Sequence, residues 1–485
     1  MTLSLALNNA LSGLQANTQQ AEIISTNVAN ALTEGFGRRD VSLSSLAATG
    51  GVRVDGVIRA SSPAVSESRR FADAAAAGAS ARSQAYARLS AAVGEPGGPG
   101  ALATVAADFD AALGAAADTP ESSTLLQRAA LAAGDFAASI NRIAAEVMNL
   151  RVSADTSIAS QVQTINSSLG KIQSLNAEIK ARQLSGGDVS ALLDQRETLV
   201  KEVSGMIPIR TDERPFGEIA IYARNGGQLL DGKAFELGFT PSPAAPPGAT
   251  VANGGLSGLT LNGFPIAIGE GGGNGLLDGG SLEAAFEIRD TVTVQSFAML
   301  DGLAANLIDR TQDLPEDATL SPGDAGLFTD AGAAFDPANE VGVAFRISLN
   351  QLVDPSAGGD ASRLRDGLNA VAPGAPGDAT VLRGLRTALS TNEPASLASG
   401  LTGNRSATGF AAELSATLLT SADRAESSAV FEQGAATALR EAELAATGVD
   451  TDQELSRLLQ VEQAYSANAR VVSVVDDLLQ RLLQI

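Results

Sequence analysis

Both ends of this 485-residue chain carry a stripe of apolar side chains at alternating intervals of four and three residues. The N-terminal stripe comprises Leu3, Leu7, Ala10, Leu14, Asn17, Ala21, Ile24 and Val28. The C-terminal stripe comprises Leu458, Val461, Tyr465, Asn468, Val472, Val475, Leu479 and Leu482. This spacing averages about 3.5 residues, the period that keeps one face of a helix against a partner helix. The pattern predicts that the two termini pair as a coiled coil, and that this seam takes part in self-assembly.

Each stripe contains one asparagine, Asn17 or Asn468. A polar side chain in such a seam costs stability but can fix the register of the two helices, because it must find a partner. The alternative is that either asparagine faces a gap or solvent in the assembled bundle. Tyr465 is expected to pack with its hydroxyl at the edge of the bundle.

The interior is dominated by helical periodicity. Helices are predicted over 64–93, 101–117, 140–183, 188–204, 283–312 and 408–447, and one more opens at Pro120. Residues 206–280 differ, because short runs of β-formers are separated by Gly, Pro and Asn, which predicts small strands joined by turns. Extended segments are also predicted at Val52–Arg59 and Val341–Leu349.

These elements predict a mainly α fold with a small inserted β-rich domain, an α+β multidomain chain. Residues 1–45 and 446–485 would form an inner terminal coiled-coil domain. Residues 46–205 and 281–445 would form a long helical-bundle shaft with some strand. Residues 206–280 would be the inserted β-rich outer domain, carried on the shaft and not added at one end of the chain.

The composition removes several classes of function. The chain has no cysteine and no histidine, so Ser-His-Asp hydrolases, thiol chemistry and the usual zinc sites are excluded. A formal net charge of −22 argues against a nucleic-acid partner. No basic residue precedes Glu22 and no segment has a membrane-spanning apolar run, so neither a cleaved signal peptide nor membrane insertion is expected.

Three candidate sites are weak. Asp450, Asp452 and Glu454 resemble the start of a calcium loop. However, Leu455 and Val461 occupy the positions at which such a loop needs Gly and Glu. The better interpretation is that these are acidic residues in the first turn of a helix. The glycine-rich run 269–275 lacks a following Gly-Lys-Ser/Thr and is interpreted as a turn or linker. A glycosidase-type carboxylate pair needs no local signature and stays a remote alternative. No catalytic residue, metal or cofactor is predicted.

The terminal motifs resemble the bacterial flagellar axial family of rod, hook and hook-associated proteins. The N-terminal motifs are Ala10-Leu-Ser-Gly-Leu14, Ser25-Thr-Asn-Val-Ala-Asn30 and Thr33-Glu-Gly-Phe36. The C-terminal motifs are Gly448-Val-Asp-Thr-Asp-Gln-Glu-Leu455 and Gln463-Ala-Tyr-Ser-Ala-Asn-Ala-Arg-Val-Val472. The resemblance marks Asn27, Asn30, Thr33, Gly35 and Phe36 as family-motif residues.

The interior motifs resemble the hook-associated branch of that family. They are Pro120-Glu-Ser-Ser-Thr-Leu-Leu-Gln-Arg128, Leu175-Asn-Ala-Glu-Ile179, Leu192-Leu-Asp-Gln-Arg196, Leu199-Val-Lys-Glu-Val203 and Ala220-Ile-Tyr-Ala-Arg-Asn-Gly-Gly227. Hook and distal rod proteins of the family place β-rich domains soon after the first helix and lack this long helical interior. Phe36 departs from the family pattern, in which many members have Tyr.

The resemblance implies a structural junction protein between flagellar hook and filament, with no enzymatic activity. Its terminal helices would line the axial export channel, and its copies would form a ring at the distal end of the hook. The expected partners are the hook protein, a second junction protein and an export chaperone. The expected location is the extracellular flagellum, reached by type III export without a cleaved signal peptide. The alternatives are another axial protein (hook or distal rod) and, more remotely, a rod-associated peptidoglycan hydrolase.

Overall fold

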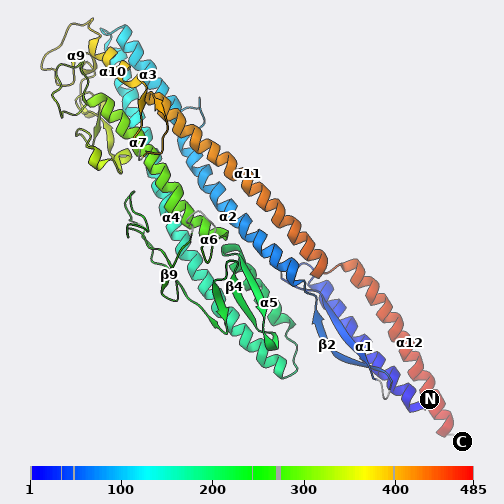
Figure 1. Cartoon of the computed structure of the whole chain (residues 1–485). Helices are drawn as coiled ribbons and strands as arrows, with labels where there is room; N and C mark the ends of the chain where they lie inside the picture. The colour runs from blue at the N-terminus through cyan, green and yellow to red at the C-terminus, as the bar shows by residue number, and fades with distance from the viewer. Residues whose placement is uncertain are drawn as a thin grey trace.

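The computed structural model describes residues 3–33, 35–46, 50–242, 244–268, 275–396 and 399–483. The molecule is elongated, and both ends of the chain lie at the same tip (Figure 1). Helix α1 (Leu3–Ala29) and helix α12 (Thr451–Leu483) lie side by side there, with the hairpin of β1 (Arg39–Ser45) and β2 (Val52–Arg59) against α1. We call these four elements the stalk and the remainder of the chain the shaft.

Three long helices run along the shaft, with α11 packed against α2 over much of its length (Figure 1). They are α2 (Pro63–Val93), α4 (Ser123–Leu184) and α11 (Ala407–Thr447). The end remote from the stalk is built from α3 (Leu102–Asp118), α7 (Thr293–Gln312), α9 (Arg363–Asp366) and α10 (Thr380–Ser390). Nearer the stalk, α4 is flanked by α5 (Ser190–Met206) and α6 (Gly280–Glu287).

Local capping explains where two of the long shaft helices, α4 and α11, begin. The Ser122 hydroxyl accepts a hydrogen bond from the Leu125 amide at 3.4 Å, so α4 begins at Ser123 and not at Pro120. In the same way, the Ser406 hydroxyl accepts from the Gly409 amide at 3.1 Å at the start of α11. Side-chain oxygens of this kind satisfy amides that have no partner inside the helix.

Two small antiparallel sheets follow α5 and pack beside α4. The first has the strand order β3 (Ile209–Glu213), β4 (Ile219–Ala223), β5 (Gln228–Asp231), β6 (Lys233–Ala234). The second contains β7 (Leu237–Gly238), β8 (Leu259–Leu261) and β9 (Phe264–Ile266). This confirms the predicted fold class, a mainly α protein with a small inserted β-rich region. The boundaries of the three predicted domains stay a prediction.

The shaft has two separate hydrophobic cores. The one remote from the stalk is rich in alanine and is centred on Phe109, Phe136 and Phe328, whose ring centroids lie 5.7–6.5 Å apart. The other joins α4 and α5 to the sheets and buries Ile165, Ile221 and similar side chains. Small alanine side chains let neighbouring helices approach closely, so the shaft is well packed without many aromatic residues.

Two predicted elements need correction. The strand predicted at Val341–Leu349 exists only as β11 (Ile347–Leu349), which pairs with β10 (Phe328–Asp330), because Val343–Arg346 forms the short helix α8. The buried Asp301 carboxylate accepts the amides of Gly342 and Ala344 at 2.7 and 2.8 Å and so holds the turn that α8 needs. The helix predicted over 283–312 is interrupted by a π-helical turn at Ile288–Val292.

Other segments were not predicted. The sequence pattern did not predict helix α10, strand β1 or the short pair of strands β12 (Glu393–Pro394) and β13 (Asn404–Arg405). Most of the glycine-rich run, residues 269–274, lies outside the described residues. Across the described ranges, none of the helices combines the length and the apolar character that crossing a bilayer requires.

Candidate assembly interface

Helices α1 and α12, which carry the two predicted stripes, pack against each other in the stalk. Every position of the N-terminal stripe is buried or half-buried, and Ala10, Asn17 and Ile24 are the most enclosed. In the C-terminal stripe only Val475 is fully buried, and Leu458, Val461, Asn468 and Val472 are half-buried. Tyr465, Leu479 and Leu482 remain 47%, 38% and 59% exposed. A single copy of the chain therefore leaves apolar surface of α12 uncovered, and the role of these positions in assembly stays a prediction.

The two stalk helices approach each other closely at a glycine. A Cβ atom placed on Gly13 would lie 2.6 Å from Nδ2 of Asn468, well inside van der Waals contact. The asparagine in the C-terminal stripe therefore packs over a residue that has no side chain. The asparagine in the other stripe, Asn17, is 9% exposed, and its Nδ2 atom finds no hydrogen-bond partner among the described residues.

Asn27 joins three segments at the base of the stalk. Its Nδ2 atom donates to the Arg39 carbonyl at 2.8 Å and to Oε2 of Glu454 at 3.0 Å, and its Oδ1 atom accepts the Arg39 amide at 3.0 Å. Asn27 is fully buried and Glu454 is 1% exposed. Arg457 reaches from Glu454 to Asp40, so α12 is also tied to β1. The family-motif residue Asn27 is thus the central contact between α1, β1 and α12.

The remaining family-motif residues shape the turn that leaves α1. Asn30 donates to the Thr26 carbonyl at 2.9 Å and accepts from the Thr33 hydroxyl at 3.3 Å. Gly35 has φ +81°, a conformation that favours glycine, and its carbonyl accepts from Arg59 at 3.2 Å. The Phe36 ring lies under the Arg39 guanidinium, 4.8 Å from ring centroid to Cζ. Glu34 of the same motif lies outside the described residues.

One carboxylate connects the hairpin to the shaft. The Asp194 oxygens on α5 each accept from a different guanidinium, Arg39 at 2.7 Å and Arg59 at 2.7 Å. All three side chains are at most 19% exposed.

In the same helix, Arg196 donates to Asn176 and to the Gly217 carbonyl, and burial lowers the pKa of its guanidinium to about 10.

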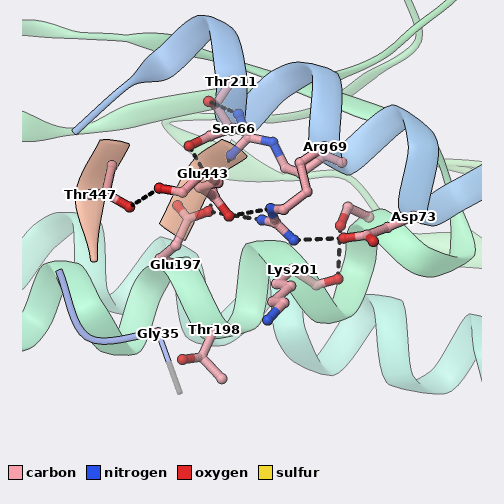
Figure 2. A network of polar contacts seen from close by, with 12 residues as sticks. Gly35, Ser66, Arg69, Asp73, Glu197, Thr198, Lys201, Thr211, Glu443 and Thr447 are labelled. Carbon is pink, nitrogen blue, oxygen red and sulfur yellow. Dashed lines mark hydrogen bonds and ion pairs between the residues drawn. The ribbon is translucent and has the colours of Figure 1, made fainter. Parts of the chain in front are cut away.

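A second polar network joins α2, α5 and α11 (Figure 2). The buried Arg69 forms ion pairs with Asp73 at 2.6 Å, Glu443 at 2.5 Å and Glu197 at 3.6 Å. Arg440 pairs with the other oxygen of Asp73 at 2.9 Å. We call this cluster, together with the contacts of Asn27 and Asp194, the joint between stalk and shaft.

The joint also contains a second buried guanidinium. Arg70 follows Arg69 on α2, contacts Glu197 at 3.4 Å and donates to the Thr211 hydroxyl at 3.1 Å. Burial lowers the pKa of Arg70, and the nearby Glu197 carboxylate opposes this shift. Removing one partner from a buried charge pair is strongly destabilising, so loss of one of these carboxylates is expected to weaken the packing of α2, α5 and α11.

The acidic residues at the start of α12 make structural contacts. Among the described residues, no acidic side chains are grouped as a metal site would require. Asp450 accepts the amides of Asp452 and Gln453 at 3.0 and 3.1 Å, which makes it the cap of α12, while Glu454 belongs to the joint. The structural role of Glu454, Asp194 and Arg69 was not predicted, because their partners lie far away in the sequence.

Comparison with known proteins identifies three matching family models. Residues 87–327 match the flagellar hook-associated protein FlgK helical domain. Residues 442–485 match the C-terminal region of the flagellar basal body rod FlgEFG proteins, and residues 7–36 match the flagella basal body rod protein family. The two terminal matches coincide with the stalk helices, and the central match covers much of the shaft.

Two curated relatives and one solved structure are similar over about half their lengths. Flagellar hook-associated protein 1 of Escherichia coli K12 is 28% identical over 264 residues, 52% of this chain and 47% of the relative. The protein of the same name from Salmonella typhimurium LT2 is 26% identical over 263 residues, 52% of this chain and 47% of the relative. The flagellar hook junction protein FlgK of Burkholderia pseudomallei gives a TM-score of 0.43 at 20% identity, covering 55% of this chain and 47% of that one.

The relatives are structural flagellar proteins and not enzymes, in agreement with the prediction of no enzymatic activity. The chain spans about half the length of the curated relatives it matches. The central helical domain and both terminal matches occur in the same order as the motifs identified in the sequence. The chain therefore belongs to the FlgK-type family of flagellar hook-associated proteins.

Proposed function

We propose that this chain joins the flagellar hook to the filament and self-assembles as a ring at the distal end of the hook. Its family membership supports a place in the flagellum, and the single observation that carries the finer assignment is the stalk. Both termini of the chain contribute to one helical pair, and this pair leaves Tyr465, Leu479 and Leu482 partly exposed in a single copy. Burial of that apolar surface against neighbouring copies would favour assembly.

The joint gives this function its mechanical basis. A junction protein must transmit load between its inner helices and its outer body without letting them rotate independently. Asn27 links α1, β1 and α12 within the stalk, and Arg69 links α2, α5 and α11 within the shaft. The Asp194 carboxylate on α5 connects the two parts, because it accepts hydrogen bonds from both strands of the hairpin. Charged hydrogen bonds of this kind are shorter and stronger than neutral ones, so the joint resists bending better than apolar contact alone.

The proposed partners are the hook protein on one side, a second junction protein on the other, and an export chaperone before secretion. The proposed route is type III export without removal of an N-terminal signal, and the proposed site is the extracellular flagellum. The terminal helices would continue the wall of the axial channel. This proposal assumes that the predicted seam residues and domain boundaries are correct.

Electron microscopy of cells that lack the gene would test the function. Hooks of normal length without filaments, and filament subunits shed into the medium, are the expected result. Absent or shortened hooks would instead place the protein in the rod or the hook, which is the second candidate. Intact filaments would overturn both assignments.

A further inference from the structure

The two hydrophobic cores of the shaft change over at the same level on two neighbouring helices. On α4 the core remote from the stalk extends as far as Ala154, and the other core begins at Ile158. On the continuous run of α6, the π turn and α7, the change falls between Phe286 and Ile288. We call the two parts the near half and the remote half of the shaft, according to their distance from the stalk.

Charged side chains form a layer at this level. The fully buried Arg289, in the π turn, pairs with Asp155 of α4 at 3.0 Å and with Asp290 at 2.7 Å. Directly before the π turn, Glu287 pairs with Arg82 of α2 at 3.0 Å. We call these five residues the waist. A π turn inside a helix often marks a functional position or a bend, and here it lies within the waist.

The segment between β7 and β8 runs along α4 across the waist (Figure 1). In the near half, the Asn166 side chain of α4 accepts from and donates to the backbone of Leu237 at 2.9 and 2.8 Å. At the waist, the Asp155 carboxylate accepts the Ser242 amide at 2.7 Å. In the remote half, the Arg151 guanidinium donates to three backbone carbonyls, those of Pro246, Pro247 and Ala249. We call residues 244–257 the clasp.

The clasp also contacts other elements on both sides of the change between cores. A Cβ atom placed on Gly248 would lie 3.1 Å from Cγ1 of Val341. Val341 lies just before α8, whose first residue, Val343, belongs to the remote core. On its return, the clasp offers the Ser257 carbonyl to Arg289 at 2.9 Å. One segment therefore connects the waist to the remote half.

Charge holds the clasp more than apolar burial does. Among the residues 244–257, only Ala249 and Leu256 are buried. Beneath them, Arg151 and Asp155 are 3% and 2% exposed, and burial lowers the pKa of Arg151. Desolvation of such charges offsets much of what their hydrogen bonds contribute. Both side chains regain water when the clasp lifts, and segments with few buried apolar contacts open locally at low cost in free energy.

We propose that the clasp is a latch that determines whether the two halves of the shaft move as one body. When it is closed, its contacts with Arg151, Asp155 and Val341 hold the remote half in one orientation. When it is open, the halves are joined by the long helices that cross the waist, and the shaft bends at the π turn. This inference concerns the chain by itself and does not depend on the proposed function.

Distances between spin labels on the purified full chain test the latch, because the native chain has no cysteine. Lys233→Cys on β6 and Arg383→Cys on α10 place one label on each half, at exposed positions. In this background, Arg151→Met removes the guanidinium that binds the clasp and keeps an unbranched side chain. The width of the distance distribution should at least double.

Arg142→Met is the matched control for Arg151→Met. Arg142 lies on the same helix and also donates to backbone carbonyls, those of Ala92 and Gly100, at 2.9 and 3.4 Å. These contacts lie beside the remote core and do not cross the waist. The control should keep the narrow distribution. An unchanged width in Arg151→Met, or equal broadening in both variants, would overturn the proposal.

A disulfide provides a second test that removes none of the charged contacts. The separation between Gly248 and Val341 allows a disulfide in Gly248→Cys with Val341→Cys. Relative to the reduced sample, oxidation should slow hydrogen exchange of the Ala249 amide and of amides in the π turn tenfold or more. Amides of α3 should exchange equally in both samples.

The disulfide test decides the matter if circular dichroism shows that Arg151→Met does not fold. Equal exchange of the π-turn amides in the oxidised and reduced samples would show that the clasp does not control the waist, and would overturn the proposal. A latch demonstrated in this way would stand even if gene deletion left filaments intact, an outcome that overturns only the proposed function.

Discussion

Asn27 on α1 donates a hydrogen bond to Glu454 on α12 at 3.0 Å, although the two residues are 427 positions apart in the chain. Both side chains are buried, and Asn27 also satisfies the amide and the carbonyl of Arg39. This contact fixes where the last turn of α1 meets the first turn of α12. The base of the stalk is therefore held by polar pairing, whereas the role of the apolar stripes along its length stays a prediction.

Asn27→Ala should loosen the base of the stalk. The substitution leaves the Arg39 amide and carbonyl buried without their partner, which costs about 1–3 kcal/mol for each unsatisfied group. Amides of α1 and β1 should lose native-state hydrogen-exchange protection, while α4 should not. Thr26→Ala is the matched control, since the Thr26 hydroxyl only donates back to the Glu22 carbonyl in its own helix. Equal exchange in the two variants would show that the contact is dispensable.

The periodic parts of this fold could be predicted because they depend on neighbours in the sequence. The helices α2, α4, α5 and α11 and the small β-rich region follow local pattern. The joint could not be predicted in this way, because Glu454 also fits the ordinary role of an acidic residue in a helical first turn. Only the folded structure brings Asn27 into contact with Glu454. The first part of the strand predicted at Val341–Leu349 was wrong for the same reason, since Asp301 stabilises a helical turn at residues 41 and 43 positions further along the chain.

Asp194→Asn should detach the hairpin from α5. Asp194 is the shared partner of Arg39 and Arg59, and its loss leaves two largely buried guanidinium groups without that carboxylate. Removing one member of a buried ion pair costs about 3–5 kcal/mol, and the partial exposure of this one reduces the expected loss in unfolding free energy to about 2–3 kcal/mol. Urea denaturation would measure it.

Asp55→Asn is the control for Asp194→Asn. Asp55 also contacts an arginine at 2.7 Å, but that arginine, Arg53, is 65% exposed. Exposed ion pairs contribute little to stability, so this variant should unfold like the wild type. If both variants lost the same stability, burial of the Asp194 contacts would not be the cause.

Gly13→Ala should be coupled energetically to Asn468→Ala. Alanine is favoured over glycine inside a helix by about 0.5–1 kcal/mol, so Gly13→Ala alone would stabilise α1 if there were room. Here the new methyl group would meet the Asn468 side chain at 2.6 Å. We expect the alanine to destabilise the stalk when Asn468 is present and to stabilise it when Asn468 is Ala. A double-mutant cycle on α1 exchange protection measures the coupling, and additive effects would contradict the close approach.

Val472→Asp should open the stalk without unfolding the shaft. Val472 is half-buried in the C-terminal stripe, whereas Val474, two residues later, is 57% exposed. A carboxylate at 472 must be desolvated to keep α12 on α1, so the pair should separate and the variant should fail to join hooks. Val474→Asp is the control for α1–α12 pairing. Unchanged protection of α1 and α12 in Val472→Asp would show that the seam does not hold these helices together.

Glu283→Gln should change the pH dependence of stability in one direction. Burial raises the pKa of the Glu283 carboxyl, although the Gly279 amide donates to it at 2.7 Å and opposes the shift. An acid whose pKa is higher in the folded state contributes its full stabilisation of the fold at pH values below its unfolded-state pKa. This stabilisation is lost as the pH rises through the folded-state pKa. Glutamine does not ionise, so the variant does not lose stability in this way, and its side-chain oxygen can still accept a hydrogen bond from the Gly279 amide. The unfolding free energy of the variant minus that of the wild type should therefore increase from about pH 4 to about pH 7, measured by urea titration at each pH. A constant or falling difference would show that the folded environment does not favour the protonated acid.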